Sequence, residues 1–206
     1  MGLALHKTFH AKAVAGRRLS ALAAALAALA PPSARILDVG CGDGALARRL
    51  MDLRADLEIK GIDVLDRRPT QIPVDIFDGR TIPFGERSFD FVMFVDVLHH
   101  TENPAALLAE AVRVAGRGII LKDHLREGFL AGPTLRLMDW FANAPLGVAL
   151  PYNYWTKSQW NAAFDALDLR PAVWRTRLGL YPFPASLVFE RSLHFATLAR
   201  IGPERE

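Results

Sequence analysis

The chain has 206 residues, of which 51% are hydrophobic and 23% are charged, and its formal net charge is +3. This length suits one domain with a sizeable core, and the composition is typical of a globular protein. The basic residues are scattered without forming a run, which argues against a nucleic-acid partner. The single cysteine, Cys41, excludes an internal disulfide and favours a reducing, cytoplasmic location.

The most apolar stretch is residues 20–30, which consists almost entirely of alanine and leucine. It is too short for a membrane span of about 20 residues. A basic start followed by an apolar run also occurs in signal peptides, but this run lies well inside the chain and leads into a strand. We therefore expect a core-packing helix within a helical segment at 1–33. His6 and His10 precede it, and we expect them to be solvated or to cap the helix.

Apolar runs without period-2 alternation recur along the first two thirds of the chain, and such runs indicate strands buried on both faces. They are expected at residues 34–39, 58–62, 74–77, 89–95 and 118–121. Helices are expected at 45–53 and from Asn103-Pro104, where asparagine caps the helix and proline takes its first position. Strands that alternate with helices predict parallel βαβ units in a doubly wound, Rossmann-like α/β fold with helices on both faces.

Beyond Lys122 the alternation stops. Residues 124–155 combine glycine, proline and large apolar side chains, and we expect a lid insertion after the fifth strand. A helix is expected at 156–167, then strands at 172–178 and 186–195. The connection between these two strands is too short for a parallel crossover, so they should pair antiparallel. The sheet is then mostly parallel, seven-stranded, with an antiparallel C-terminal strand.

The segment Asp38-Val39-Gly40-Cys41-Gly42-Asp43-Gly44 joins a strand to a helix. Glycine allows a sharp turn and lets a ligand approach the backbone, and a helix start offers free N–H groups. Asp63 ends the next strand, where a carboxylate accepts hydrogen bonds from ribose hydroxyls. The glycine run also fits the dinucleotide pattern G-x-G-x-x-G/A, so an NAD-dependent oxidoreductase is an alternative.

Further motifs follow in order along the chain. An aspartate stands two residues before the first glycine, where a dinucleotide fold normally has an apolar residue. Asp78-Gly79 is followed by Ile82-Pro83-Phe84, and Ser88-Phe89-Asp90 introduces the strand that leads to Leu98-His99-His100. Over about residues 34–121 the chain resembles the small class I methyltransferases, whose pattern runs LDVGCGxG, GxD, D-x-x-x-x-PF, SFD and LHH.

The resemblance implies that S-adenosylmethionine is the cofactor and S-adenosylhomocysteine the product. The glycine loop would hold the methionine part, Asp63 the ribose and Asp78 the adenine amino group. The cofactor-binding residues that it implies are Asp38, Gly40, Cys41, Gly42, Asp63, Val64, Asp78, Gly79 and Val95. In one place the chain departs from the family: residues 64–73 replace a full helix, and Pro69 and Pro73 predict a loop there.

The domain boundaries follow from these assignments. We expect a single methyltransferase domain over 1–206, with a cofactor-binding core at 34–123. The lid insertion at 124–155 would follow the core, and a C-terminal helix with an antiparallel strand pair would occupy 156–206. The oligomeric state does not follow from the sequence.

The resemblance implies an in-line methyl transfer, in which positioning supplies most of the acceleration. A general base is needed only for an acceptor that starts protonated, so the motifs do not identify the acceptor. His100 and His124 follow the fourth and fifth strands and are the candidate catalytic bases. The alternative for each is packing or a backbone hydrogen bond. Lys122 and Asp96 are expected to be solvated or ion-paired.

Aromatic side chains in the insertion suggest the kind of acceptor. Trp140, Tyr152 and Tyr154 are candidate substrate-binding residues, although such side chains also build a lid's own core. We expect a small apolar or aromatic acceptor, with no transmembrane segment and no nucleic acid involved. No His, Cys or Asp cluster has the spacing of metal ligands, so no metal is expected. A methyltransferase-like partner protein without its own activity is a further alternative.

Overall fold

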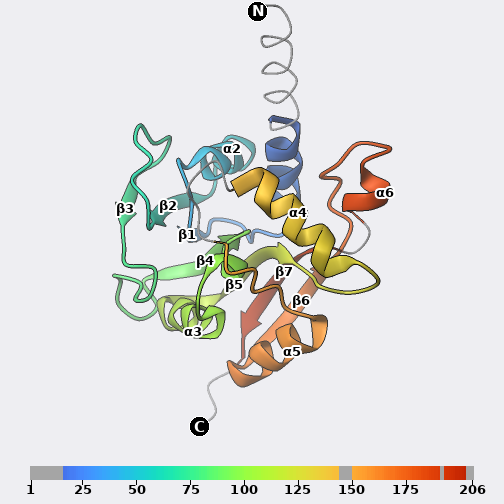
Figure 1. The fold of residues 1–206 in the computed structure, drawn as a ribbon. Coiled ribbons are helices and arrows are strands. Elements are labelled where there is room, and N and C mark those ends of the chain that lie inside the picture. Colours follow the sequence, from blue (N-terminus) through green and yellow to red (C-terminus); the bar gives the residue numbers. More distant parts are fainter. Residues whose placement is uncertain (1–15, 144–149, 191–192, 203–206) are drawn as a thin grey trace, which may run out of the picture.

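The computed structural model describes residues 16–143, 150–190 and 193–202. Its seven strands form one sheet in the order β3-β2-β1-β4-β5-β7-β6 (Figure 1). Only β7 runs antiparallel to its neighbours, β5 and β6. The strands are β1 (Arg35–Val39), β2 (Glu58–Asp63), β3 (Val74–Ile76), β4 (Phe89–Val95), β5 (Ala115–His124), β6 (Leu169–Arg175) and β7 (His194–Ile201). The predicted Rossmann-like fold, mostly parallel with an antiparallel C-terminal strand, is therefore confirmed.

Helices cover both faces of this sheet. Helix α2 (Ala45–Leu53) and the helical segment 16–27 lie on one face, and α3 (Pro104–Val114) and α5 (Lys157–Ala166) lie on the other (Figure 1). Neighbouring side chains of a strand point to opposite faces, so the core is divided by the sheet. In β4, Phe91 packs on the α2 side and Val92 on the α3 side. Each such burial stabilises the fold by about 1.5–3 kcal/mol.

Side chains cap the starts of α3 and α5. Oδ1 of Asn103 accepts a hydrogen bond from the Ala106 N–H at 3.1 Å, and Pro104 is the first helical residue of α3. Thr156 caps α5 and forms a reciprocal capping box with Gln159. These contacts satisfy N–H groups that a helix otherwise leaves without partners.

The strand order reverses at β1, which lies between β2 and β4. Val39 at the end of β1 pairs with Ile62 on one side and Phe94 on the other, so these three strands end at the same edge. In an open α/β sheet, ligands bind in the crevice at such a reversal, beyond the carboxyl ends of the strands. The fold therefore predicts a site beside Gly40, Asp63 and the end of β4.

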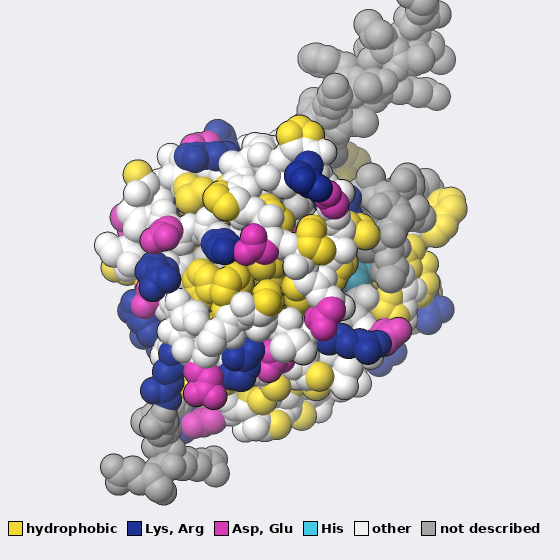
Figure 2. Space-filling view, turned by 90° about the vertical axis from the view of Figure 1, so that its left-hand side faces the viewer, with side chains coloured by type: hydrophobic (Ala, Val, Ile, Leu, Met, Phe, Trp, Pro, Cys, Tyr) yellow, Lys and Arg dark blue, Asp and Glu magenta, His cyan; other side chains and the backbone are white. Residues whose placement is uncertain are grey.

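No helix joins β2 to β3 in the structure, and residues 64–73 form an irregular loop, as expected from their prolines. This edge of the molecule exposes Val64, Leu65 and Ile76, which are 51%, 37% and 55% exposed. Figure 2 views the molecule from the side of β3 and shows apolar side chains lying between charged ones of both signs.

The predicted strand at 186–195 is wrong except at its last two residues, because Ser186–Phe189 forms the short helix α6 and β7 begins only at His194. Leu187 and Val188 are 65% and 47% exposed, so these apolar residues have no sheet face to pack on. The strand that does pair with β5 lies close to it, since a Cβ on Gly118 would be 2.3 Å from the carbonyl oxygen of Ala199.

The other boundary error is smaller. The strand predicted at 172–178 occupies 169–175 instead, as β6. The expected antiparallel pairing with the last strand is confirmed. Within the described part of the region expected to be a lid, the connection after β5 leads into helix α4 (Ala131–Asn143).

Among the residues that the structure describes, no helix is both long and apolar enough to cross a membrane. The leucine-rich segment instead packs on the sheet, with Leu22, Leu26 and Leu29 at most 7% exposed. His6 and His10 lie outside the described residues.

Asp38 is an ionisable side chain inside β1, with only 2% of its surface exposed. Burial and the negative charge of Asp63 raise the pKa of Asp38 to about 7, from 3.8. Below pH 4 both the folded and the unfolded chain carry a protonated Asp38. Between pH 4 and 7 only the unfolded chain loses this proton, so stability falls as the pH rises.

We therefore expect Asp38→Asn to gain stability relative to the unaltered chain as the pH rises from 4 to 7. The gain reaches about 4 kcal/mol, because one pKa unit corresponds to about 1.4 kcal/mol. Urea unfolding at several pH values measures it. Asp52→Asn, an exposed carboxylate of α2, is the matched control. A difference that stays constant across this pH range would contradict the prediction.

Candidate active site

A cleft with a volume of about 1220 Å³ lies at the carboxyl edge of the sheet. It contains residues from the loops after β1, β2, β3 and β4 and from the start of α3. Its lining residues are Gly40, Gly42, Asp43, Asp63, Val64, Leu65, Arg67, Phe77, Asp78, Gly79, Arg80, Asp96, Val97, His100, Thr101, Glu102, Asn103, Ala106 and Leu107. The cleft therefore follows the strand order from β3 to β4.

The glycine loop forms one wall of this cleft. Gly40 has φ +74°, and a Cβ there would lie 2.6 Å from Cγ2 of Val97. Gly42 has φ +62°, and its N–H donates to Oδ2 of Asp63 at 2.8 Å. Both the left-handed backbone and the close approach of Val97 require glycine at position 40. The loop is thus held between the ends of β2 and β4 with its backbone facing the cleft.

Asp63 is the last residue of β2 and is 6% exposed. Its second carboxylate oxygen, Oδ1, accepts a hydrogen bond from the Leu65 N–H at 2.9 Å. Two backbone donors therefore fix the orientation of the carboxylate at the cleft. Each carboxylate oxygen can accept more than one hydrogen bond, so the pair of hydroxyls of a ribose can still bind here.

Asp78 and Gly79 line the cleft after β3. Oδ1 of Asp78 accepts hydrogen bonds from the backbone N–H groups of Arg80 and Thr81, both at 2.8 Å. These bonds hold the pKa of Asp78 below its usual range. Val64 lies close by, since a Cβ on Gly79 would be 3.0 Å from its Cγ1. The structure thus brings together six of the expected cofactor residues: Gly40, Gly42, Asp63, Val64, Asp78 and Gly79.

Three other expected cofactor residues do not line the cleft. Asp38 is buried in β1. The Sγ atom of Cys41 lies against Gly61, where a Cβ would be only 2.4 Å away, and burial raises the pKa of this thiol. Val95 packs against the core beside the segment 16–27. Val97, which sequence reasoning missed, contacts the glycine loop in the position expected for Val95 and lines the cleft.

A charged group lies behind the end of β4. Asp96 lines the cleft, and its carboxylate binds the fully buried Lys122 ammonium and, at 3.0 Å, the Arg18 guanidinium. Burial acts to raise the pKa of Asp96, but the charges of Lys122 and Arg18 outweigh it, and the pKa lies well below its usual range. The expected ion pairing of Lys122 and Asp96 is present, and Arg18 ties the N-terminal helical segment to it.

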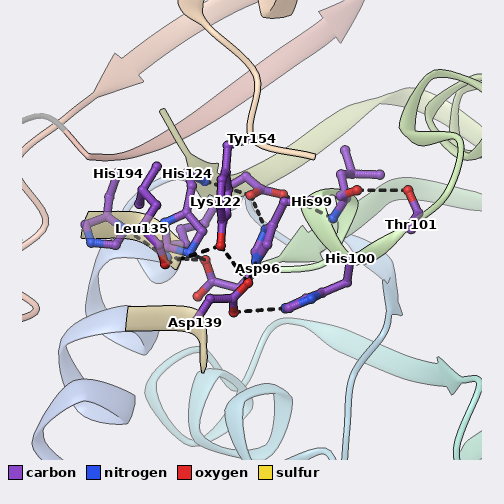
Figure 3. Close-up of polar contacts among 12 residues, drawn as sticks. Asp96, His99, His100, Thr101, Lys122, His124, Leu135, Asp139, Tyr154 and His194 are labelled. Carbon is purple, nitrogen blue, oxygen red and sulfur yellow. Dashed lines mark hydrogen bonds and ion pairs between the residues drawn. The ribbon is translucent and has the colours of Figure 1, made fainter. Parts of the chain in front are cut away.

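The histidines form a second polar group beside it, shown in Figure 3. His99 and His100 belong to the single turn η1 (Leu98–His100) that follows β4. Nδ1 of His99 lies 2.6 Å from Oδ1 of the buried Asp123. Burial opposes the charged form of His99, but the carboxylates of Asp123 and Asp139 outweigh it and raise its pKa to about 9.

The two candidate catalytic histidines lie in different surroundings. His100 lines the cleft, with its side chain 13% exposed, and its Nε2 lies 3.5 Å from Oδ1 of Asp139. His124 is 6% exposed and does not line the cleft. Burial, followed by the charge on His99, holds the pKa of His124 well below its usual range. His100 is therefore the imidazole that a bound molecule can reach.

The candidate aromatic residues of the insertion do not line this cleft. Tyr154 is 4% exposed, and its hydroxyl donates to Oδ2 of Asp139 at 2.7 Å. Tyr152 lies with Tyr154 beside a separate cavity of about 140 Å³. Trp140, on α4, is 54% exposed. Tyr154 thus contacts the histidines both through Asp139 and directly, with its ring stacked on that of His99 at 5.4 Å between centroids.

Asp139 is the functional candidate that sequence reasoning missed most clearly. It is 3% exposed and contacts both His99 and His100, which lie on a different element. The signal in the sequence is an acidic residue among the large apolar side chains of 135–141, a stretch that lies within α4. No metal-ligand cluster was expected because no such residues have metal-ligand spacing along the chain. In the folded chain, however, Asp139 lies beside His99 and His100 although it is distant in sequence.

The phthiotriol/phenolphthiotriol dimycocerosates methyltransferase 1 of Mycobacterium ulcerans is 33% identical over an alignment of 123 positions that covers 51% of this chain and 45% of that protein. The chain spans less than half the length of the curated relatives that it matches, between 36% and 49%.

Two solved structures share the fold. One is the complex that contains the Haloferax volcanii Trm112 methyltransferase activator, with 17% identity, a TM-score of 0.72 and 93% of each chain covered. The other is a Thermotoga maritima protein described as a SAM-dependent methyltransferase and possible histamine N-methyltransferase, with 18% identity, a TM-score of 0.68 and 96% of each chain covered.

Residues 10–172 match the family described as methyltransferase domain. This match covers more than half of the chain and includes the glycine loop, Asp63 and the turn after β4. The glycine pattern alone fits both a methyltransferase and an NAD-dependent oxidoreductase. The family match favours the methyltransferase. The chain belongs to the class I S-adenosylmethionine-dependent methyltransferases.

Proposed function

We propose that this chain transfers the methyl group of S-adenosylmethionine to a small acceptor that is apolar or aromatic. The observation that carries the proposal is a single cleft whose wall includes both the glycine loop with Asp63 and the imidazole of His100. Its volume is about 1220 Å³. Pockets for one drug-sized ligand are roughly 300–1000 Å³, so the cleft has room for the cofactor and a second small molecule.

The strand order gives the cleft a direction. Asp78 follows β3, Asp63 ends β2, the glycine loop follows β1, and His100 follows β4. An adenosyl group bound beside Asp78 and Asp63 would direct its methionine part toward Gly40. The methyl group would then face the end of the cleft at His100, which is where the acceptor would bind.

The chemistry needs little from the protein beyond this arrangement. A lone pair of the acceptor forms the new bond to the methyl carbon, and the carbon–sulfur bond breaks with its electron pair remaining on sulfur. Holding the two reactants in line can lower the barrier by about 7–11 kcal/mol. A protonated acceptor must also lose its proton, and His100 is the imidazole of the cleft wall.

The surface supports a small apolar acceptor. The face seen in Figure 2 carries basic and acidic side chains in mixture, without the continuous basic patch that binds nucleic acid. The insertion and the α6 region expose large apolar side chains instead, among them Phe129, Leu137, Trp140 and Phe183. The similar proteins include a phthiotriol/phenolphthiotriol dimycocerosates methyltransferase and a possible histamine N-methyltransferase, both of which fit a small acceptor.

Replacing Asp63 tests the cofactor half of the proposal. We expect Asp63→Ala to weaken S-adenosylhomocysteine binding by about 2 kcal/mol, or roughly 30-fold, because the ribose loses a charged acceptor. Isothermal titration calorimetry measures this loss. Asp66→Ala, which removes an exposed carboxylate of the adjacent loop, should bind normally. Unchanged affinity in a folded Asp63→Ala variant would show that the ribose is held elsewhere.

A transfer assay tests the acceptor half. With S-adenosylmethionine labelled in its methyl group, we expect label to enter phenols, quinols or lipid-like alcohols, which organic extraction recovers. Transfer RNA and a protein extract serve as competing acceptors. Label in the RNA or protein fraction would contradict the proposed acceptor class. Cofactor binding without transfer to any acceptor would favour a partner protein without its own activity.

A further inference from the structure

Two imidazoles and a carboxylate meet beside the cleft. One possible ligand atom from each of His99, His100 and Asp139 lies within 4.8 Å of the other two. Nε2 of His99 is 3.8 Å from Oδ2 of Asp139, and Nε2 of His100 is 3.5 Å from its Oδ1. Figure 3 shows Asp139 entering from α4 opposite the two histidines of η1.

These separations fit a bound metal ion better than direct hydrogen bonds. A hydrogen bond between nitrogen and oxygen is usually about 2.7–3.2 Å long, and both distances exceed this range. Two ligands that each lie about 2.0 Å from a zinc ion in a tetrahedral site are about 3.3 Å apart. Shifts of a fraction of an ångström would therefore place all three groups around one ion.

The groups behind the ligands are those that metal sites use. Asp123 binds Nδ1 of His99 at 2.6 Å and thereby directs Nε2 toward Asp139. The Tyr154 hydroxyl donates to the Asp139 carboxylate at 2.7 Å. A metal-binding histidine almost always bonds through its other nitrogen to a carboxylate or carbonyl, and ligating carboxylates are themselves hydrogen-bonded.

A buried nitrogen without a partner gives independent support. His99 is 2% exposed, and its Nε2 has no hydrogen-bond partner within the part of the chain that the structure describes. Nδ1 of the adjacent His124 is in the same condition, with its ring 4.5 Å from that of His99 between centroids. Buried polar atoms in folded proteins normally have partners. A bound ion would supply the partner that Nε2 of His99 lacks.

We propose that His99, His100 and Asp139 bind one divalent transition-metal ion of the zinc class. Two histidines and one carboxylate leave coordination positions open, and His100 is the ligand that lines the cleft. The open side therefore faces the acceptor end. This assigns His100 to the metal rather than to proton transfer.

The site also specifies the acceptor, and this step rests on the proposed function. A phenolic hydroxyl bound at the open position loses its proton to solvent more easily, as metal-bound water does. The phenolate oxygen forms the bond to the methyl carbon, the carbon–sulfur bond breaks, and S-adenosylhomocysteine leaves with the electron pair. The metal keeps its oxidation state throughout. The acceptor class is therefore a phenol.

Metal binding is measured first on the full chain, stripped with a chelator and without cofactor or acceptor. We expect calorimetry to show one Zn²⁺ per chain, and Co²⁺ to give the visible absorption of a low-symmetry site. Asp139→Asn and His100→Gln, which preserve side-chain size, should each weaken Zn²⁺ binding at least about 100-fold. Tyr154→Phe, which removes only the hydroxyl behind the ligand, should weaken it by about 10-fold.

The control is His194→Gln, because His194 lies outside the three-residue cluster and its Nε2 bonds the Phe189 carbonyl. Its Zn²⁺ affinity should match that of the unaltered chain. Circular dichroism verifies that each variant is folded. No binding of Zn²⁺ or Co²⁺ by the folded chain would overturn the site. Equal affinity in the Asp139→Asn, His100→Gln and unaltered chains would do so too.

The role in catalysis is tested separately. We expect chelation to abolish transfer to a phenol, and added Zn²⁺ to restore it, while S-adenosylhomocysteine affinity stays unchanged. Full transfer by the metal-free chain would overturn the role of the ion in activating the acceptor. Specific Zn²⁺ binding by a chain that methylates nothing would leave the metal site standing and defeat the proposed function instead.

Discussion

The pairing of Lys122 with Asp96 is the interaction on which the carboxyl edge of the sheet depends. Lys122 is fully buried in β5, and Asp96 follows β4. Burial lowers the pKa of Lys122, and the neighbouring Asp96 carboxylate opposes that effect. Removing Asp96 would leave the buried Lys122 ammonium without this carboxylate partner, which destabilises the fold. This pair, extended by Arg18, joins β4, β5 and the N-terminal helical segment at the point where the cleft opens.

Asp96 also connects the two halves of the site. The same loop supplies Val97, which packs against the glycine loop, and leads into the turn that carries the histidines. Asp123, next to Lys122, accepts hydrogen bonds from the Leu98 and His124 N–H groups as well as from His99. A displacement of the loop after β4 would therefore move both the cofactor wall and the histidine cluster.

The sequence predicts the parts of the structure that depend on local chemistry. The strands β1, β2 and β4, the helix caps of α3 and α5, and the glycine loop were all predictable from apolar runs, capping residues and turns. The failures lie where distant residues decide the outcome. Asp139 reaches the histidines only through the packing of α4. The start of β7 is set by pairing with β5, while the equally apolar residues before it form α6.

The two halves of the cleft differ in how their sequences can vary. The cofactor half uses glycine backbone and the ends of β1 to β3, where positive φ and close contacts allow few residue types. The other half places Asp139 and Tyr154 from an insertion that is outside the continuous run of parallel strands. Burying polar groups costs free energy unless they are paired. The histidine cluster therefore lowers stability, and cofactor binding does not require it. Under the proposed function this cluster lies at the acceptor end of the cleft, so changes in the insertion would alter the choice of acceptor and leave the cofactor site intact.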